Sequence, residues 1–276
     1  MTAPLLEVTG ITAGFGATTV LHGITFSVPR GTIAGIFGLN GAGKSVTLKT
    51  VAGVVPARTG RVLLGGEDIT ALSPERRVGL GMGHVPQGRQ VFPGLTVEEN
   101  RRLGAYTLRR KDKSRYQPAL DGVYDRFPVL RERRSQLAGT MSGGQQASLS
   151  VGRALINEPE LILVDEPSAG LSPVAQLELR EVLRAVAQSG VTMVLVEQNI
   201  AFGLSLVDTA HLLQTGTVVH SSPVAELDND TLARHLGIGQ VLGAATGKAL
   251  SARRSDAPSD QPLIPKQVRP RVRRTP

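Results

Sequence analysis

The sequence predicts an α/β fold whose core is a parallel sheet, and three observations carry that prediction. Residues 161–164 and 191–196 are apolar runs, typical of strands buried on both faces. Residues 174–188, between them, have the apolar spacing of an amphipathic helix. A strand, a helix and a strand in this order form a right-handed βαβ unit with parallel strands. Finally, a glycine-rich segment at 38–45 joins an apolar run to a helix-forming segment.

Short β-type runs separated by glycine turns fill the N-terminal part. They lie at 5–8, 20–21, 24–28 and 33–37, and another run at 61–64 precedes Gly65-Gly66. Such runs are typical of strands joined by tight turns. We therefore expect a small antiparallel β subdomain beside the parallel sheet.

The middle of the chain predicts helices. Residues 96–136 are rich in Arg, Glu, Leu and Ala, and Pro118 and Pro128 are positions where helices should end or begin. A further helix should run from Ser142 to about residue 156. We expect a helical subdomain at about 88–152 inserted in a domain spanning 1–243. Residues 244–276, poor in apolar periodicity, should form a basic, disordered tail.

Composition bounds the class of protein. The chain has 276 residues, 41% of them hydrophobic and 20% charged, as in ordinary soluble domains. It shows no apolar stretch of the roughly 18 residues that a membrane span needs and no secretory signal. The absence of cysteine excludes disulfides and thiolate metal sites and fits a cytoplasmic protein.

The net charge of +8 is concentrated in two segments. Residues 101–134 hold eleven Lys/Arg against four Asp/Glu, and residues 244–276 hold eight against two. The rest is slightly acidic, with twelve basic and seventeen acidic residues. The two basic segments indicate a surface that lies near an anionic partner, such as a membrane or nucleic acid. The alternative is that they are simply two solvated faces.

Residues 38–45 fit G-x-x-x-x-G-K-[ST], a phosphate-binding loop. Glycines let consecutive N–H groups point at a polyphosphate, and the helix N-terminus adds partial positive charge. The Lys reaches the β- and γ-phosphates and the Ser hydroxyl ligates Mg²⁺. A glycine-rich turn with a chance lysine is the alternative, which the flanking strand and helix disfavour. The candidate binding residues are Gly38, Asn40, Gly41, Gly43, Lys44, Ser45 and Val46.

Two further motifs lie downstream. The run at 161–164 ends in Asp165-Glu166, placed where α/β sheets bind ligands. Asp165 is a candidate for the Mg²⁺ shell and Glu166 for activating the water that attacks the γ-phosphate, although an acidic pair can merely cap a strand. Ser142, Gly143, Gly144 and Gln145 supply a hydroxyl, small residues and a helix start suited to an anion, 23 residues before Asp165.

With these motifs the chain resembles the nucleotide-binding subunits of ABC transporters, over about residues 5–240. The resemblance implies a P-loop NTPase core and a head-to-tail dimer with two ATP molecules, in which residues 142–145 contact the ATP held by the partner. It assigns Gln87 to the loop that contacts Mg²⁺ and the attacking water, and Phe15 to adenine stacking. A polar loop residue and a packed loop residue are the respective alternatives.

One branch of the family is matched closely. Residues 85–89, 91–100, 196–199 and 232–238 are similar to the shorter ATPase subunit of branched-chain amino acid importers. ATPases of urea and short-amide importers are close relatives and remain an alternative. In this chain Gln198 stands at the position of the family's switch histidine, and Gly170 replaces an aspartate. Glutamine can hydrogen-bond a γ-phosphate but cannot carry a proton, so a heterodimer with a second ATPase is expected.

The resemblance thus implies an energy-coupling ATPase that uses Mg-ATP at the cytoplasmic face of the membrane. Its expected partners are two permease subunits, a second ABC ATPase and, indirectly, a solute-binding protein; nucleic acid is not expected. Two other classes stay open as alternatives. One is a non-transport ABC ATPase, which normally has a coiled-coil insertion or a second cassette. The other is a regulatory module that binds ATP without hydrolysis.

Overall fold

A six-stranded sheet forms the centre of the computed structural model, which describes residues 3–88, 91–106, 108 and 112–237. Its strand order is β10-β9-β3-β8-β7-β6, and all neighbours are parallel except β10, which is antiparallel to β9. The strands are β3 (Ile33–Phe37), β6 (Met82–Val85), β7 (Leu161–Asp165), β8 (Thr192–Glu197), β9 (Thr209–Gln214) and β10 (Thr217–Pro223). The predicted parallel sheet is confirmed.

The predicted antiparallel subdomain is confirmed as a second sheet, in the order β2-β1-β4-β5. Its strands are β1 (Leu6–Phe15), β2 (Thr18–Val28), β4 (Ala57–Leu64) and β5 (Glu67–Asp68). The runs expected at 20–21 and 24–28 are one strand rather than two. Gly23 between them has φ 76° and is skipped in the pairing with β1, so it forms a bulge instead of a turn.

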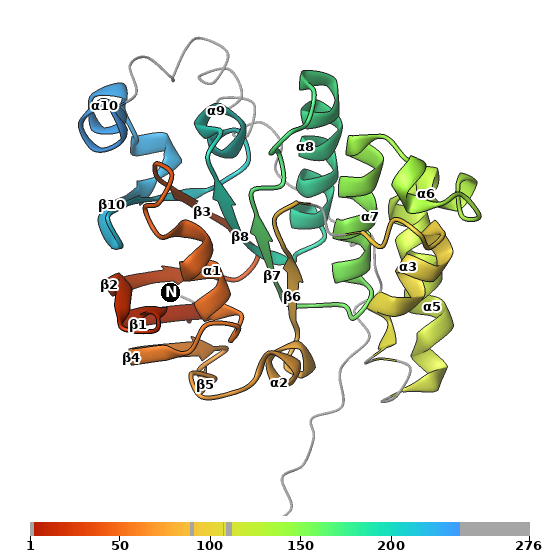
Figure 1. Cartoon of the computed structure of the whole chain (residues 1–276), viewed down its shortest axis with the longest axis horizontal. Helices are drawn as coiled ribbons and strands as arrows, with labels where there is room; N and C mark the ends of the chain where they lie inside the picture. The colour runs from red at the N-terminus through yellow and green to blue at the C-terminus, as the bar shows by residue number, and fades with distance from the viewer. Residues whose placement is uncertain (1–2, 89–90, 107, 109–111, 238–276) are drawn as a thin grey trace, which may run out of the picture.

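Helices lie on both faces of the six-stranded sheet (Figure 1). The described helices are α1 (Lys44–Val51), α2 (Pro74–Gly79), α3 (Val97–Gly104), α5 (Lys113–Arg126), α6 (Pro128–Glu132), α7 (Gly143–Leu155), α8 (Pro173–Gln188), α9 (Ile200–Leu204) and α10 (Asn229–Leu236). Of these, α3, α5 and α6 pack against α7 rather than over the strands (Figure 1). Single 3₁₀ turns lie at Ala138–Thr140 and Val224–Glu226. In the part of the chain described, no helix has both the length and the apolar character needed to cross a membrane.

Two hydrophobic cores lie on either side of this sheet, because successive side chains of a strand point to opposite faces. In β7, Ile162 and Val164 belong to the core shared with α7 and α8, whereas Leu161 and Leu163 belong to the core shared with α1 and the antiparallel sheet. Every residue of β7 is buried. The prediction of a strand covered on both faces is therefore confirmed.

Pro118 does not end a helix, contrary to the expectation. It lies inside α5, which begins after the N-cap Asp112, whose carboxylate accepts from Ser114 N and Arg115 N. Leu120 and Val123, two and five residues further along, are buried in the helical core, and this burial offsets the hydrogen bond that proline cannot donate. Pro128 begins α6, as expected. The expected tail, residues 244–276, lies outside the described residues.

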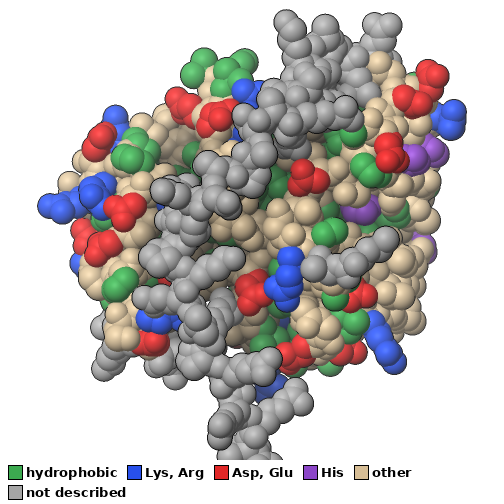
Figure 2. Space-filling view, turned by 180° about the vertical axis from the view of Figure 1, so that it is seen from behind, with side chains coloured by type: hydrophobic (Ala, Val, Ile, Leu, Met, Phe, Trp, Pro, Cys, Tyr) green, Lys and Arg blue, Asp and Glu red, His purple; other side chains and the backbone are tan. Residues whose placement is uncertain are grey.

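Three arginines of the basic mid-chain segment, residues 101–134, form ion pairs with acidic side chains of the same fold. Arg102 pairs with Glu98, Arg115 with Glu158, and Arg131 with Asp125. Arg101 is buried, with its guanidinium 3.6 Å from the centroid of the Tyr124 ring. On the face drawn in Figure 2, acidic and basic side chains are intermixed. The excess positive charge of this segment is thus partly satisfied within the fold.

Candidate active site

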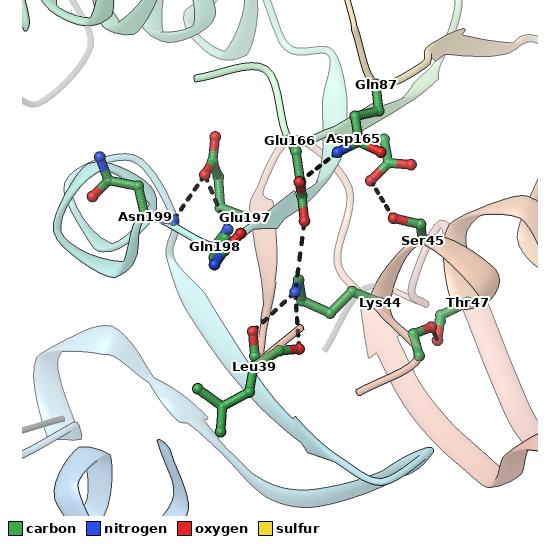
Figure 3. Close-up of polar contacts among 12 residues, drawn as sticks. Leu39, Lys44, Ser45, Thr47, Gln87, Asp165, Glu166, Glu197, Gln198 and Asn199 are labelled. Atoms are coloured by element: carbon green, nitrogen blue, oxygen red, sulfur yellow. Dashed lines mark hydrogen bonds and ion pairs between the residues drawn. The ribbon is translucent and has the colours of Figure 1, made fainter. Parts of the chain in front are cut away.

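The loops that follow four neighbouring strands meet at one edge of the parallel sheet. In the order β3, β8, β7 and β6, these loops begin after Phe37, Glu197, Asp165 and Val85. Since parallel strands end at the same edge, residues far apart in the sequence become neighbours there. Figure 3 shows Lys44, Ser45, Gln87, Asp165 and Glu166 brought together in this way.

The loop between β3 and α1 adopts the conformation that its glycines permit. Gly41 and Gly43 have φ of 80° and 102°, in the left-handed region. A Cβ atom at Gly43 would lie 2.8 Å from Leu21 Cδ2, and one at Gly38 would lie 2.4 Å from the Leu213 carbonyl oxygen. Glycine is therefore required at 38 and 43 by the close approach of β2 and β9 as well as by the curl of the loop.

Lys44 is folded back over this loop. Its Nζ atom donates to the carbonyl oxygens of Gly38 and Leu39 at 2.9 and 3.2 Å, and lies 3.6 Å from Glu166 Oε1. The side chain is only 4% exposed. A buried ammonium group held at the start of a helix is suited to contact an anion seated in the loop.

Ser45 and Asp165 form the second element of the site. Ser45 Oγ donates to Asp165 Oδ1 at 2.9 Å. Asp165 is 2% exposed, and burial raises the pKa of its carboxyl above the ordinary value. A hydroxyl, a carboxylate and the amide oxygen of the nearby Gln87 are hard oxygen donors, the type that Mg²⁺ prefers. The donor set therefore fits this metal.

Glu166 projects from a strained turn directly after β7. Its φ is 42°, unusual for a residue with a side chain, and its N–H donates to the Val196 carbonyl at 2.9 Å. The carboxylate accepts from Gln87 Nε2 at 2.7 Å. Glu166 thus contacts both Lys44 and Gln87, from the loops after β3 and β6.

Gln198 lies beside this cluster, in the loop after β8, and its side chain is exposed. It lines a cavity of about 290 Å³ together with Glu166, Ser168, Ala169, Gly170, Gln176, Glu197 and Asn199. Sequence reasoning missed Glu197 and Gln176 as members of this region. The available signal for Glu197 was an acidic residue ending an otherwise apolar strand, a position that burial makes unfavourable for a charge.

Ser142 and Gln145 are not part of this cluster. They begin α7, on the opposite side of the sheet from α1 (Figure 1), and form a capping box. Ser142 Oγ accepts from Gln145 N at 3.3 Å, and Gln145 Oε1 accepts from Ser142 N at 3.1 Å. Gly144 packs closely on α8, because a Cβ atom there would lie 3.3 Å from Ala175 Cβ and 2.8 Å from the movable end of the Glu178 side chain. Ser142 is exposed and Gly143 half-buried.

The remaining predicted residues lie at the rim. Phe15 ends β1 in the antiparallel sheet and is 55% exposed, so a face of its ring is accessible for stacking. Asn40 is an exposed residue of the phosphate loop, and Val46 is half-buried on the first turn of α1. In the described part of the chain, Phe15 is not among the hydrogen-bond or ion-pair partners of Lys44 and Glu166.

The fold and this constellation define a phosphate-loop nucleotide-binding domain. The chain belongs to the ABC transporter family, whose model matches residues 21–169, and it is an ATP-binding subunit of that family. Family membership implies ATP hydrolysis. The sequence-based expectation of the family and of its α/β fold is confirmed.

Curated relatives cover most of this chain. The chain is 40% identical to the high-affinity branched-chain amino acid transport ATP-binding protein BraG of Pseudomonas aeruginosa, over 82% of this chain and 96% of BraG. It is 35% identical to a probable branched-chain amino acid transport ATP-binding protein, LivF, of Archaeoglobus fulgidus, over 81% and 94%. The lipopolysaccharide export protein LptB of Haemophilus influenzae is 27% identical over 86% and 98%.

Solved structures agree on the fold. The crystal structure of an ABC transporter cassette in its ADP conformation superposes with a TM-score of 0.73, at 23% identity, over 91% of this chain and 99% of that one. A nucleotide-free cassette gives the same TM-score at 22% identity, over 90% and 99%. At this identity the likeness establishes the architecture alone.

Proposed function

We propose that this chain is the Mg-dependent, energy-coupling ATPase of an importer for branched-chain or related amino acids. The observation that carries the solute class is the 40% identity to BraG across 96% of its length. The 27% identity to LptB makes a lipid-exporting role the weaker candidate. Urea and short-amide importers remain the alternative within the same branch.

For ATP binding, the proposal relies on the loop between β3 and α1. Lys44 can exchange the Gly38 and Leu39 carbonyls for phosphate oxygens, because both partners accept from the same ammonium group. The backbone of Gly38, Asn40, Gly41 and Gly43, with Ser45 and Val46 at the helix start, surrounds the phosphates. Phe15 stacks on the adenine ring.

For hydrolysis, Glu166 is the group that orients and deprotonates the attacking water. Ser45, Asp165 and Gln87 would hold Mg²⁺, which would neutralise phosphate charge when bound. Gln87 and Lys44 position the Glu166 carboxylate from two sides. Gln198 hydrogen-bonds the γ-phosphate through its side-chain amide and cannot act as a proton carrier.

The separation of residues 142–145 from the phosphate loop supports their role in a dimer. We assign Ser142, Gly143, Gly144 and Gln145 to the ATP held by a second ABC ATPase, in a head-to-tail heterodimer. The proposal also includes a division of the chain: residues 1–243 form the ATP-binding domain. Its helical part, at about 88–152, contacts two permease subunits. In this proposal the chain works at the cytoplasmic face of the membrane, and a solute-binding protein acts on the permeases.

The test is purification of the tagged chain from detergent-solubilised membranes of its source, followed by mass identification of co-purifying proteins. Two polytopic permeases and a second ATPase are expected. Recovery of the chain alone, or with ribosomes or DNA, would overturn the transport assignment while leaving ATP hydrolysis intact.

The solute is tested separately by uptake of labelled leucine and labelled urea in cells carrying the wild-type chain or its Glu166→Gln variant. Loss of leucine uptake with unchanged urea uptake supports the amino-acid assignment. The reverse pattern would assign the chain to the urea and short-amide branch.

A further inference from the structure

Glu197, the last residue of β8, holds two loops of the site through its carboxylate. Its Oε1 atom accepts from Ser168 N at 2.9 Å, and its Oε2 atom accepts from Gln198 N and Asn199 N, both at 3.1 Å. Ser168 lies in the loop between β7 and α8. The other two donors lie in the loop after β8 (Figure 3). One side chain therefore connects two segments about 30 residues apart in the sequence.

This carboxylate is buried without a cation. Glu197 is 1% exposed, and in the described ranges no Lys, Arg or His forms an ion pair with it. Burial of a charge in a strand end is costly unless hydrogen bonds replace its hydration. Three backbone N–H groups make that replacement here, and an apolar residue at 197 would leave all three donors without this partner. The Glu197 carboxylate is thus positioned to accept hydrogen bonds from these three backbone N–H groups.

The two loops are those that carry the chemistry. Glu166, at the start of the first loop, contacts Lys44 and Gln87, and Gln198 opens the second loop. A longer hydrogen bond joins the second loop to the first turn of α8, from Asn199 Nδ2 to Gln176 Oε1 at 3.3 Å. The cavity of about 290 Å³ lies between them, so the separation of the loops sets its shape.

We propose that Glu197 is a positioning residue that fixes the loop after Glu166 and the Gln198 loop relative to each other during turnover. This inference rests on the proposed ATPase function. Glu197 would act through its neighbours, since both of its carboxylate oxygens accept hydrogen bonds from backbone N–H groups.

The Glu197→Gln variant tests the proposal. Glutamine has one acceptor oxygen, so its NH₂ group must face either Ser168 N–H or the Gln198 and Asn199 N–H groups, and one loop is released. We expect kcat for ATP to fall at least about tenfold. The Kd of a fluorescent ATP analogue should stay within about twofold, because the phosphate loop is untouched.

Amide hydrogen exchange measured by NMR on the full chain supplies a readout that a general loss of stability would not move. Exchange should accelerate at Ser168, or at Gln198 and Asn199, while amides within β7 and β8 keep their protection. Glu197→Asp, which retains charge and both acceptors, should keep more activity than Glu197→Gln. The inference would be overturned if Glu197→Gln kept the wild-type kcat. It would also be overturned if the amides of Ser168, Gln198 and Asn199 exchanged at their wild-type rates in that variant.

Thr192→Val is the matched control. Thr192 lies at the other end of β8, is equally buried at 1% exposure, and its Oγ1 atom accepts from Gly31 N at 2.9 Å. This variant should lose stability and keep kcat. If the wild-type protein itself does not hydrolyse ATP, the proposed function fails, whereas the exchange data still decide whether Glu197 holds the two loops.

Discussion

Glu166 accepts a hydrogen bond from Gln87 Nε2 at 2.7 Å, and this contact joins the loop after β6 to the end of β7. A residue outside the nucleotide loop thereby restrains the group proposed to activate water. Because Gln87 borders the helical part of the chain, a displacement of those helices would change the position of the Glu166 carboxylate. The contact offers a direct connection between subunit movement and chemistry.

Replacing Glu166 by Gln should abolish turnover while leaving ATP bound. The amide cannot accept the proton of the attacking water, so kcat should fall at least about a hundredfold. Steady-state phosphate release and retention of labelled ATP measure the two effects. Glu160→Gln, at an exposed ion pair with Arg30, is the control and should hydrolyse ATP normally. Rapid hydrolysis by the Glu166→Gln protein would refute the role of Glu166.

Replacing Lys44 by Ala should abolish ATP binding. Its buried ammonium group is the one cation that contacts both the phosphate loop and Glu166 in the described structure. Titration with a fluorescent ATP analogue should show at least about a hundredfold weaker binding, typical of the loss of a charge-assisted contact to phosphate. Unchanged affinity would mean that nucleotide binds elsewhere.

Replacing Asp165 by Asn should stabilise the protein in EDTA and inactivate it. Burial raises the pKa of this carboxyl, so the protonated form is favoured in the folded state. The stabilisation that this form gives is lost as the pH rises through the raised pKa. At neutral pH the neutral Asn removes that penalty and can still accept from Ser45 Oγ. Thermal unfolding should shift upward by about 3 °C. Asp121→Asn, at an exposed position, should not shift it.

Arg77 should be a main determinant of stability. This buried guanidinium donates to the Thr50 and Val51 carbonyls at the end of α1, at 2.9 and 2.6 Å, and also to Thr70 and Leu72. Arg77→Ala should lower the free energy of unfolding by about 3 kcal/mol, since several buried acceptors lose a charged donor. Urea unfolding measures it. The exposed neighbour Arg76 gives the control: Arg76→Ala should change the free energy of unfolding by less than about 0.5 kcal/mol.

Stability should fall between about pH 6.5 and pH 5 because of buried histidines. Burial lowers the pKa of His84 and of His211 to about 4, from 6.5 for an unperturbed imidazole. The unfolded chain therefore binds more protons in this window, and acid favours unfolding. Urea unfolding at several pH values should show a shallower slope in His211→Phe, whereas His22→Gln, at an exposed position, should match the wild type. Identical slopes in all three proteins would contradict this assignment.

The sequence predicts most of the frame of the site, since apolar runs locate β7 and β8 and glycine spacing locates the phosphate loop. These features are local, and local patterns are what periodicity and turn chemistry describe. The prediction that a helix ends or begins at Pro118 was wrong because of a tertiary contact rather than a local pattern. Burial of Leu120 and Val123 against other helices outweighs the local preference of proline, and that burial is a tertiary effect.

The geometry of Glu166 and the role of Glu197 could not be predicted in the same way. The positive φ of Glu166 depends on a hydrogen bond to Val196 in another strand, and Glu197 collects donors from two loops. Gly144 shows the same limit, because its motif suggests an anion whereas the structure also places it in close contact with Ala175 on α8. Each of these facts involves partners distant in sequence.

The strand order has a consequence for the newly synthesised chain. Strand β3, fully buried and apolar, pairs only with β8 and β9, whose residues follow it by more than 150 positions. As the ribosome delivers the chain from its N-terminus, both edges of β3 stay open until those strands emerge, which exposes a segment prone to aggregation. Ribosome-bound chains ending before β8 should therefore remain protease-sensitive at residues 33–37, and chains extending past β9 should become resistant. Strand β3, which supports the nucleotide loop, is thus synthesised early, but its pairing is complete only after β8 and β9 have emerged.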